Sequence, residues 1–209
     1  MIIAIEGIDG AGKNTLTTAV VEVLRKSGQE VQTLAFPQYE SSIPAQLASR
    51  ALYGQMGDLT DSAYAMATLF ALDRHAALEK LQRAATSSEV LLLDRYVASN
   101  AAYSVARTQE PDMADWIAEL EFSLLGLPRP DLQVLLDTPV EVAADRAQRR
   151  EALDSSRTRD VYESDADLQA RTAEAYRRLA QSHWQGRWFS VVPGQQPDAV
   201  AADILRVLS

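Results

Sequence analysis

The chain has 209 residues, of which 47% are hydrophobic and 23% are charged, a composition typical of a globular protein. Its net charge of −9 at pH 7 argues against a nucleic-acid-binding protein, which usually carries a basic surface. The absence of cysteine excludes disulfides, thiolate catalysis and cysteine metal sites. Because no apolar run approaches the length of a membrane span or a signal sequence, we expect a cytoplasmic protein that binds neither nucleic acid nor a membrane.

The predicted elements alternate between apolar strands and helices along the chain. Strands are expected at residues 2–6, 30–35, 90–94, 132–137 and 187–192. Helices are expected at residues 13–27, 42–52, 61–85, 97–107, 112–125, 139–150, 164–182 and 197–208. This alternation predicts a single α/β domain over residues 1–209, in which a five-stranded parallel sheet is flanked by helices.

The first strand leads into a glycine-rich loop. The spacing Gly7-x-x-x-x-Gly12-Lys13 is typical of a phosphate-binding loop, except that Asn14 replaces the usual Ser or Thr. Glycines let successive backbone N–H groups point into a nest, and the positive end of the following helix faces the same spot. We therefore expect the outer phosphates of a nucleotide to bind at residues 7–15. The candidate binding residues are Gly7, Gly10, Ala11, Gly12, Lys13, Asn14 and Thr15.

The carboxyl ends of the other strands also carry candidate site residues. In open parallel sheets, ligands bind outside these ends, so residues 6–13, 36–39, 94–96 and Asp137 are expected to converge on one crevice. Asp94 stands where a phosphate-binding-loop protein normally has a second acidic residue that helps to hold Mg²⁺. The next residue is Arg95, whose guanidinium can bind a phosphate through two hydrogen bonds. The alternative is an Asp–Arg surface pair without a catalytic role.

Two pairs of helical residues suggest a binding site for a planar ring. Phe70 and Arg74 are four residues apart and share a helix face, and Asn100 and Tyr103 do so at a spacing of three. A flat ring beside a forked donor suits a heterocycle, because the ring stacks and the guanidinium bonds a carbonyl. From the spacing alone, however, a structural role is favoured for both pairs.

Arginines are concentrated in one polar stretch. They are Arg146, Arg149, Arg150, Arg157 and Arg159. A charge run is usually a solvated face, but beside a phosphate-binding loop such a segment can also close over a transferring phosphoryl group and neutralise its charge. We therefore predict a lid over about residues 147–160, with Tyr162 and Glu163 directly after it.

Together these residues resemble the bacterial thymidylate kinase family. The resemblance rests on Gly7–Lys13, Phe36–Tyr39, the Phe70/Arg74 pair, Asp94–Tyr96 with Asn100 and Tyr103, and the arginine-rich lid ahead of Tyr162 and Glu163. It implies the nucleoside-monophosphate kinase fold, with a substrate-binding segment at about residues 36–75. It also implies transfer of the γ-phosphoryl group of ATP to dTMP, giving dTDP for dTTP synthesis, with Mg²⁺ as cofactor and a homodimer as the assembly.

The resemblance implies roles for individual residues as well. Phe70 would stack on thymine, Arg74 and Asn100 would bond its edge, and Tyr103 would crowd the 2′ position of the sugar. The full set of implied dTMP-binding residues is Asp9, Phe36, Tyr39, Phe70, Arg74, Arg95, Asn100, Tyr103, Tyr162 and Glu163. The implied catalytic residues are Asp9, Lys13, Arg95, Arg150 and Arg157, the implied metal ligands are Asp9, Glu163 and Asp94, and residues 7–15 would bind ATP.

Asn14 departs from the usual pattern, because most phosphate-binding loops place a hydroxyl on Mg²⁺ there. We expect the ion to shift towards Asp9 and Glu163. Two other functions stay open. A deoxynucleoside kinase would phosphorylate deoxythymidine itself, whereas a nucleotide switch or partition ATPase would use no small acceptor. The chain has neither an Asn-Lys-x-Asp guanine motif nor a second signature lysine in the loop, which disfavours the latter.

Overall fold

The computed structural model describes residues 1–153, 160–191 and 194–208. Within these residues it contains the predicted five-stranded parallel sheet, in the order β2-β3-β1-β4-β5. The strands are β1 (Ile2–Glu6), β2 (Val31–Ala35), β3 (Val90–Asp94), β4 (Leu132–Leu136) and β5 (Trp188–Val191). Every residue of β1 and β4 is buried, because these apolar strands are covered by helices on both faces.

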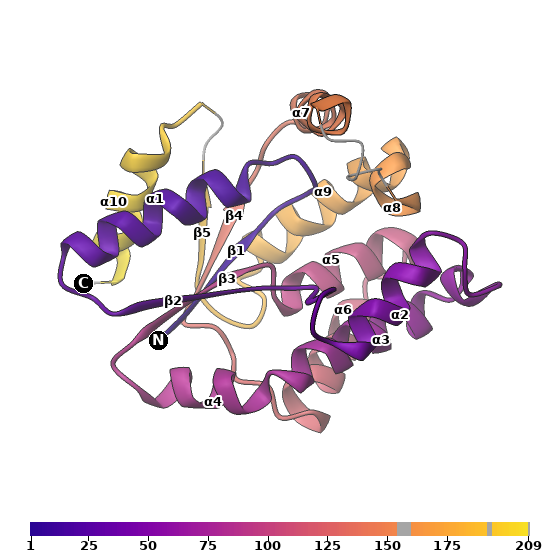
Figure 1. Cartoon of the computed structure of the whole chain (residues 1–209), viewed down its shortest axis with the longest axis horizontal. Helices are drawn as coiled ribbons and strands as arrows, with labels where there is room; N and C mark the ends of the chain where they lie inside the picture. Colours follow the sequence, from indigo (N-terminus) through magenta and orange to yellow (C-terminus); the bar gives the residue numbers. More distant parts are fainter. Residues whose placement is uncertain (154–159, 192–193, 209) are drawn as a thin grey trace.

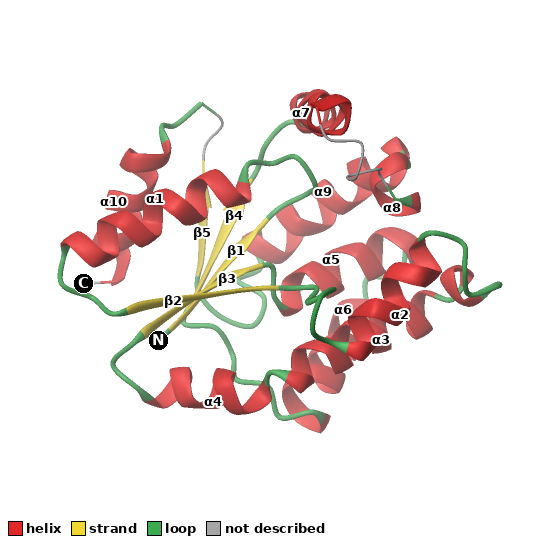
Figure 2. Cartoon of the chain, viewed as in Figure 1, coloured by secondary structure: helices red, strands yellow, loops and turns green. Residues whose placement is uncertain are grey.

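Helices cover both faces of the sheet (Figures 1 and 2). On one side α1 (Lys13–Lys26) packs against α10 (Pro197–Leu208), and on the other α5 (Val97–Thr108) packs against α9 (Ala166–Gln181). The remaining described helices are α2 (Ile43–Leu52), α3 (Ala63–Ala76), α4 (Leu78–Thr86), α6 (Met113–Ala118), α7 (Val140–Leu153) and α8 (Val161–Ser164), with a 3₁₀ turn at Leu59–Asp61. The predicted α/β class is confirmed.

Two predicted helices are divided in the structure. The helix expected at residues 61–85 is α3 followed by α4, with a break at Ala77, although neither glycine nor proline marks that position. The two parts have different partners, since α3 packs against α2 and α5 whereas α4 packs against β1 and β3. The helix expected at residues 164–182 is divided at Asp165, whose side chain accepts a hydrogen bond from the N–H of Leu168 and so caps α9.

The helix expected at residues 112–125 changes its winding half-way. It begins as α6 and continues as a π-helical turn at Glu119–Leu124. The N–H of Leu125 donates to the carbonyl oxygen of Leu120, five residues back, at 2.9 Å. Such widened turns occur frequently at functional sites.

The predicted lid begins inside a helix. The helix expected to end at residue 150 extends to Leu153 as α7, in keeping with the good helix propensity of Glu, Ala and Leu. Residues 154–159, including Arg157, lie outside the described residues, and so does the side chain of Arg150.

Candidate active site

The glycine-rich loop joins β1 to α1 and supports the lysine that the sequence singled out. Gly10 has a φ of 79°, and a Cβ there would lie 2.1 Å from the carbonyl oxygen of Ala143 in α7, so only glycine fits. The ammonium of Lys13 donates to the carbonyl oxygens of Gly7 and Ile8, at 3.3 and 3.0 Å. The loop therefore holds Lys13 back over its own turn, next to the positive end of α1.

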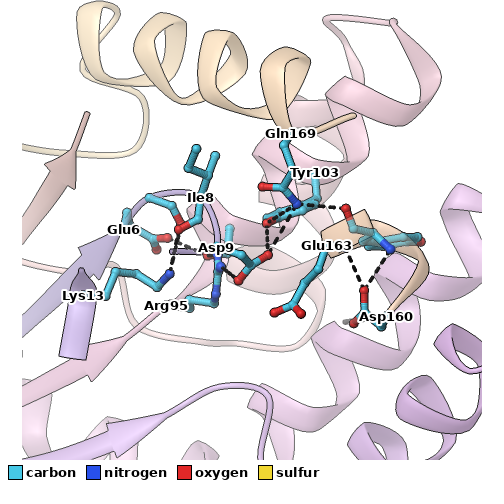
Figure 3. A network of polar contacts seen from close by, with 12 residues as sticks. Glu6, Ile8, Asp9, Lys13, Arg95, Tyr103, Asp160, Glu163 and Gln169 are labelled. Atoms are coloured by element: carbon cyan, nitrogen blue, oxygen red, sulfur yellow. Dashed lines mark hydrogen bonds and ion pairs between the residues drawn. The ribbon is translucent and has the colours of Figure 1, made fainter. Parts of the chain in front are cut away.

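An ion pair joins this loop to the end of β3 (Figure 3). The Nη2 atom of Arg95 donates to Oδ1 of Asp9 at 2.5 Å, and the hydroxyl of Tyr103 donates to Oδ2 of the same carboxylate at 2.6 Å. Arg95 has a left-handed backbone, with a φ of 66°, and its N–H donates to the carbonyl oxygen of Ile5 at 2.9 Å. The two predicted strand-end residues and the predicted helical tyrosine thus meet at one point.

A buried carboxylate at the end of β1 is connected to Arg95 of this pair through two hydroxyl groups. Glu6 accepts hydrogen bonds from the N–H of Tyr96 at 2.8 Å, the hydroxyl of Ser99 at 2.6 Å and the hydroxyl of Tyr176 at 3.1 Å. The Nη1 atom of Arg95 donates to the same two hydroxyls, at 3.2 and 3.3 Å. Glu6 therefore orients Arg95 through Ser99 and Tyr176. Sequence reasoning placed Glu6 only in the strand.

Three charged groups in and next to the loop have shifted pKa values for different reasons. Burial alone would raise the pKa of Asp9, but the positive charges of Arg95 and Lys13 lower it below its usual range. Burial and the charge of Arg95 lower the pKa of Lys13 to about 8. Burial raises the pKa of Glu6. The site therefore keeps the Asp9 carboxylate ionised and places a weakly solvated ammonium beside it.

A cavity of about 310 Å³ lies on one side of the Asp9–Arg95 pair. Both predicted helical pairs line it, Phe70 with Arg74 from α3 and Asn100 with Tyr103 from α5. One edge of the Arg74 guanidinium is taken by Glu121 of the π-helical turn, with Nε–Oε2 at 2.5 Å and Nη2–Oε1 at 2.7 Å. Burial would lower the pKa of Arg74, but the charge of Glu121 raises it.

A wider cavity, of about 1270 Å³, lies on the other side of the pair. It is lined by the loop and its neighbours, among them Asp9, Gly10, Gly12, Lys13, Asn14, Thr15, Asp94 and Arg146. Six residues line both cavities: Asp9, Phe36, Tyr39, Arg95, Asp160 and Glu163. The two cavities therefore meet at the Asp9–Arg95 pair, as two substrates of a group transfer would have to do.

The loop after β2 forms one wall of both cavities. Phe36 is buried and its ring centroid lies 6.2 Å from that of Tyr96. Asp73 of α3 accepts from the backbone N–H of Gln38 at 3.0 Å, which fixes the loop to the helix that carries Phe70. Tyr39 follows at the surface, with 42% of its area exposed.

Asp160, at the end of the predicted lid, lines the narrow cavity together with Tyr162 and Glu163. Asp160 accepts from the N–H groups of Tyr162 and Glu163, at 2.8 and 2.9 Å, and so starts α8. The buried Tyr162 ring stacks on Tyr103, with centroids 6.1 Å apart and planes at 15°. Gln169 of α9 donates to the carbonyl oxygen of Tyr162 at 2.9 Å (Figure 3). These contacts bring the predicted residues Tyr162 and Glu163 to the site.

The chain matches the family model described as thymidylate kinase over residues 5–204. The chain belongs to the thymidylate kinase family. It is 49% identical to the thymidylate kinase of Mycobacterium tuberculosis (strain ATCC 25618 / H37Rv) over 207 residues, which cover 98% of this chain and 97% of the relative. It is 34% identical to a probable thymidylate kinase of Archaeoglobus fulgidus over 151 residues, or 72% and 70% of the two chains. Human thymidylate kinase is 29% identical over 208 residues, which cover 100% of this chain and 89% of the human one.

The family and the parallel-sheet fold that the sequence predicted are thus confirmed, as is the type of enzyme that they imply: a kinase that uses ATP. Family membership and the names of these relatives support ATP-dependent phosphorylation of dTMP to dTDP. The two adjoining cavities of this chain are suited to such a transfer. The roles of individual residues stay predictions, and the contacts of Asp94, Arg146 and Asp137 bear on them.

Asp94 fits a role next to a metal ion. Its Oδ1 atom is buried and has no hydrogen-bond partner among the described residues, although it lines the wide cavity near Lys13. The described residues hold no cluster of three His, Asp or Glu side chains that could bind a metal by themselves. Mg²⁺ needs no such cluster, because it usually takes one or two carboxylates together with phosphate oxygens and water. Asn14 is exposed on the first turn of α1 and lines the same cavity.

The structure also places residues that sequence reasoning missed or placed elsewhere. Arg146 was one arginine of the charged stretch, and its Nη1 atom donates to the carbonyl oxygen of Ala11 in the loop at 3.3 Å. Asp137 was expected in the main crevice, but it pairs with Arg177 at 2.9 Å and lines a smaller neighbouring cavity. Glu121 had no sequence signal, because a charged residue in a helical stretch is usually exposed.

Proposed function

We propose that this chain transfers the γ-phosphoryl group of ATP to dTMP, giving dTDP and ADP. Membership of the thymidylate kinase family and the relatives of the same name support this reaction. The observation that carries the proposal furthest is the meeting of two cavities at the Asp9–Arg95 pair. One is wide and lined by a phosphate-binding loop, and the other is narrow and lined by an aromatic ring with amide and guanidinium groups.

On the donor side, the loop N–H groups and Lys13 bind the ATP phosphates. The pKa of about 8 lets Lys13 carry its charge at neutral pH while it remains weakly solvated, which strengthens its attraction to an anion. Arg146 lies over the loop and extends this positive surface. Residues 7–15 therefore orient the γ-phosphoryl group towards Asp9 and Arg95.

On the acceptor side, Phe70 stacks on thymine, while Arg74 and Asn100 bond its polar edge. Tyr103 occupies the space that a 2′-hydroxyl would need. Tyr39 and Arg95 hold the phosphate of dTMP, with Phe36 behind them. Because Arg95 is already oriented by Glu6, its guanidinium loses little freedom when it binds the phosphate.

The chemistry is positioning and charge neutralisation, without a covalent intermediate. The attacking oxygen of dTMP is already anionic, so no strong general base is needed. Arg95 touches the acceptor phosphate and neutralises charge that moves towards the transferring group. The lid over about residues 147–160, through Arg150 and Arg157, supplies further positive charge and excludes water.

Mg²⁺ is the proposed cofactor. Asp94 would hold it through the Oδ1 atom that has no partner, with Asp9 and Glu163 on the acceptor side. The Oδ2 atom of Asp9 already accepts from Tyr103 and, at 3.5 Å, from Gln169, whereas Oδ1 accepts from Arg95 and retains a second lone pair for a cation. When bound, Mg²⁺ neutralises negative charge on the phosphates.

Domain organisation, assembly and cellular location are proposed by analogy with the family. We propose that the whole chain acts as one kinase domain with a substrate-binding segment at about residues 36–75, as a homodimer in the cytoplasm. None of the described helices combines the length and the apolarity that crossing a membrane would require. The partners are the two small-molecule substrates, and no nucleic acid is involved.

A panel of acceptors tests the proposal directly. The purified chain is incubated with ATP and Mg²⁺ and, in parallel, with dTMP, dUMP, dCMP, AMP or deoxythymidine, and ADP release is measured. We expect dTMP to be the best acceptor and turnover without an acceptor to be negligible. Preference for deoxythymidine would show a deoxynucleoside kinase, and acceptor-independent turnover would show an ATPase; either result would refute the assignment.

A further inference from the structure

Glu121 contacts both of the polar side chains that we assign to the thymine edge. It lies in the π-helical turn Glu119–Leu124 and is completely buried. Its Oε1 atom accepts from Arg74 at 2.7 Å and from Asn100 at 2.8 Å, and its Oε2 atom accepts from Arg74 at 2.5 Å. One carboxylate thus connects α3 and α5 beneath the narrow cavity.

These contacts leave Asn100 with only one amide orientation. Its Nδ2 atom faces the carbonyl oxygen of Ala67 at 2.9 Å and the carboxylate of Glu121 at 2.8 Å. Neither partner can donate a hydrogen, so the amide nitrogen has to stand there and both of its hydrogens are used. Only the Oδ1 atom remains for a ligand, and it can only accept.

Whereas Asn100 offers a ligand only an acceptor, Arg74 offers it only donors. The two bonds to Glu121 use Nε and Nη2, which is one edge of the guanidinium. The hydrogens of Nη1 are directed away from that edge, and a guanidinium can only donate. Because Arg74 and Asn100 both line the narrow cavity, it presents a fixed donor beside a fixed acceptor.

We propose that Glu121 is a positioning residue that sets this donor–acceptor order and thereby makes the cavity select thymine over cytosine. Thymine offers a carbonyl oxygen at C4 and an N–H at N3, which match a donor and an acceptor. Cytosine offers an amino group and an unprotonated nitrogen at the same places, which mismatch both. The inference rests on the proposed function, because it concerns the base of the acceptor in that reaction.

The π-helical turn explains how a carboxylate reaches this position. The widened turn places Glu121 and Phe122 both in the interior, whereas Glu119 in the same turn is exposed. Glu119, a glutamate two residues away that is exposed, therefore provides a matched control for the buried Glu121.

The test compares Glu121→Gln with the control Glu119→Gln. A glutamine cannot accept at both ends, so its NH₂ group opposes a donor of Arg74 or lets the Asn100 amide turn over. We expect the ratio of kcat/KM for dTMP to kcat/KM for dCMP to fall about tenfold or more in Glu121→Gln. The ratio of dTMP to dUMP should not change, because uracil has the same polar edge. Glu119→Gln should retain both ratios.

These ratios do not depend on the fraction of folded enzyme, so a purely structural role of Glu121 would leave them unchanged. If Glu121→Gln yields no folded protein, Glu121→Asp tests the positioning role instead. It keeps the charge and both acceptor atoms but moves them back by one methylene. We expect the KM for dTMP to rise about tenfold while the KM for ATP stays within about twofold.

The outcomes separate the inference from the function on which it rests. If the wild-type chain phosphorylates dTMP and Glu121→Gln keeps the dTMP-to-dCMP ratio within about twofold of wild type, the role of Glu121 is refuted and the proposed function stands. Unchanged KM values for both substrates in Glu121→Asp refute it as well. If the wild-type chain does not phosphorylate dTMP, the proposed function fails.

Discussion

The two cavities that meet at Asp9 and Arg95 are built in different ways. The narrow cavity, of about 310 Å³, is bordered by buried polar groups that already have partners, such as Arg74 and Asn100, both of which bond to Glu121. The wide one, of about 1270 Å³, is bordered by exposed groups at the start of α1 such as Asn14 and Thr15. The narrow cavity, which we propose for the acceptor, is therefore pre-organised for one shape, whereas the wide cavity, which we propose for the donor, relies on charge and on an open surface.

This difference has an energetic reason. A base is recognised by a few directional hydrogen bonds, whose value depends on fixed partners in a low-dielectric setting. A triphosphate carries charge that many N–H groups can share, so its site tolerates looser side chains. Mutations on the two sides should consequently change different kinetic constants, and the pair between them should change the chemical step.

Arg95→Ala should have the largest effect, because Arg95 belongs to both cavities. We expect kcat to fall by about 10³-fold or more, the range found when a charge-neutralising arginine of a phosphoryl transfer is removed. The affinity for ATP should stay nearly unchanged. The measurements are steady-state kinetics with dTMP and calorimetric titration with ATP. Loss of ATP binding with normal turnover at saturating ATP would contradict the role assigned here.

Phe70→Ala should act on the narrow cavity alone. Stacking of a base on an aromatic ring contributes about 1–3 kcal/mol, so the KM for dTMP should rise by about 5- to 150-fold. The KM for ATP should not change, because Phe70 lines only the narrow cavity of the two. Phe70→Tyr keeps a flat ring and serves as the matched control. Equal changes of the KM values for dTMP and ATP would contradict the separate roles proposed for the two cavities.

Tyr103 allows the contribution of its ring to be separated from that of its hydroxyl. Tyr103→Phe removes the 2.6 Å bond to Asp9 but keeps the ring beside the sugar, so rejection of the ribonucleotide 5-methyl-UMP should persist. Tyr103→Leu opens that space, and the preference for dTMP over 5-methyl-UMP should fall about tenfold. Both ratios come from kcat/KM with the two acceptors. A loss of preference in Tyr103→Phe would assign the discrimination to the hydroxyl instead.

Glu6 should give the smallest effect, on stability and its pH dependence. Burial raises the pKa of Glu6 above its ordinary value of 4.5, so the folded state binds its proton more readily than the unfolded state. The resulting stability is complete below about pH 4.5 and is lost as the pH rises through the raised pKa.

Glu6→Gln cannot ionise and lacks this decline. Between pH 4.5 and 7.5, wild type should lose more of its free energy of unfolding than the variant does. Urea denaturation at several pH values measures both curves. Parallel curves would mean that Glu6 is not destabilised by burial, and the network behind Arg95 would need another explanation.

The sequence by itself was enough for the elements whose cause is local. The phosphate-binding loop follows from glycines that permit left-handed backbone, and the shared faces of Phe70 with Arg74 and Asn100 with Tyr103 follow from helical spacing. The parallel sheet follows from the alternation of apolar strands and helices, and it brings Asp9 and Arg95 to one edge. These features depend on neighbours within a few residues or on a general rule of strand direction.

Only the tertiary structure decided which groups hold those residues in place. Glu121 lies 47 residues from Arg74, and Glu6 lies 170 residues from Tyr176, so no periodic pattern links either pair. The widened turn that buries Glu121 has no marker in the sequence, because its residues also suit an ordinary helix. The sequence predicted the positions of the candidate site residues, whereas packing between distant segments determined the hydrogen-bond partners that orient Arg74, Asn100 and Arg95.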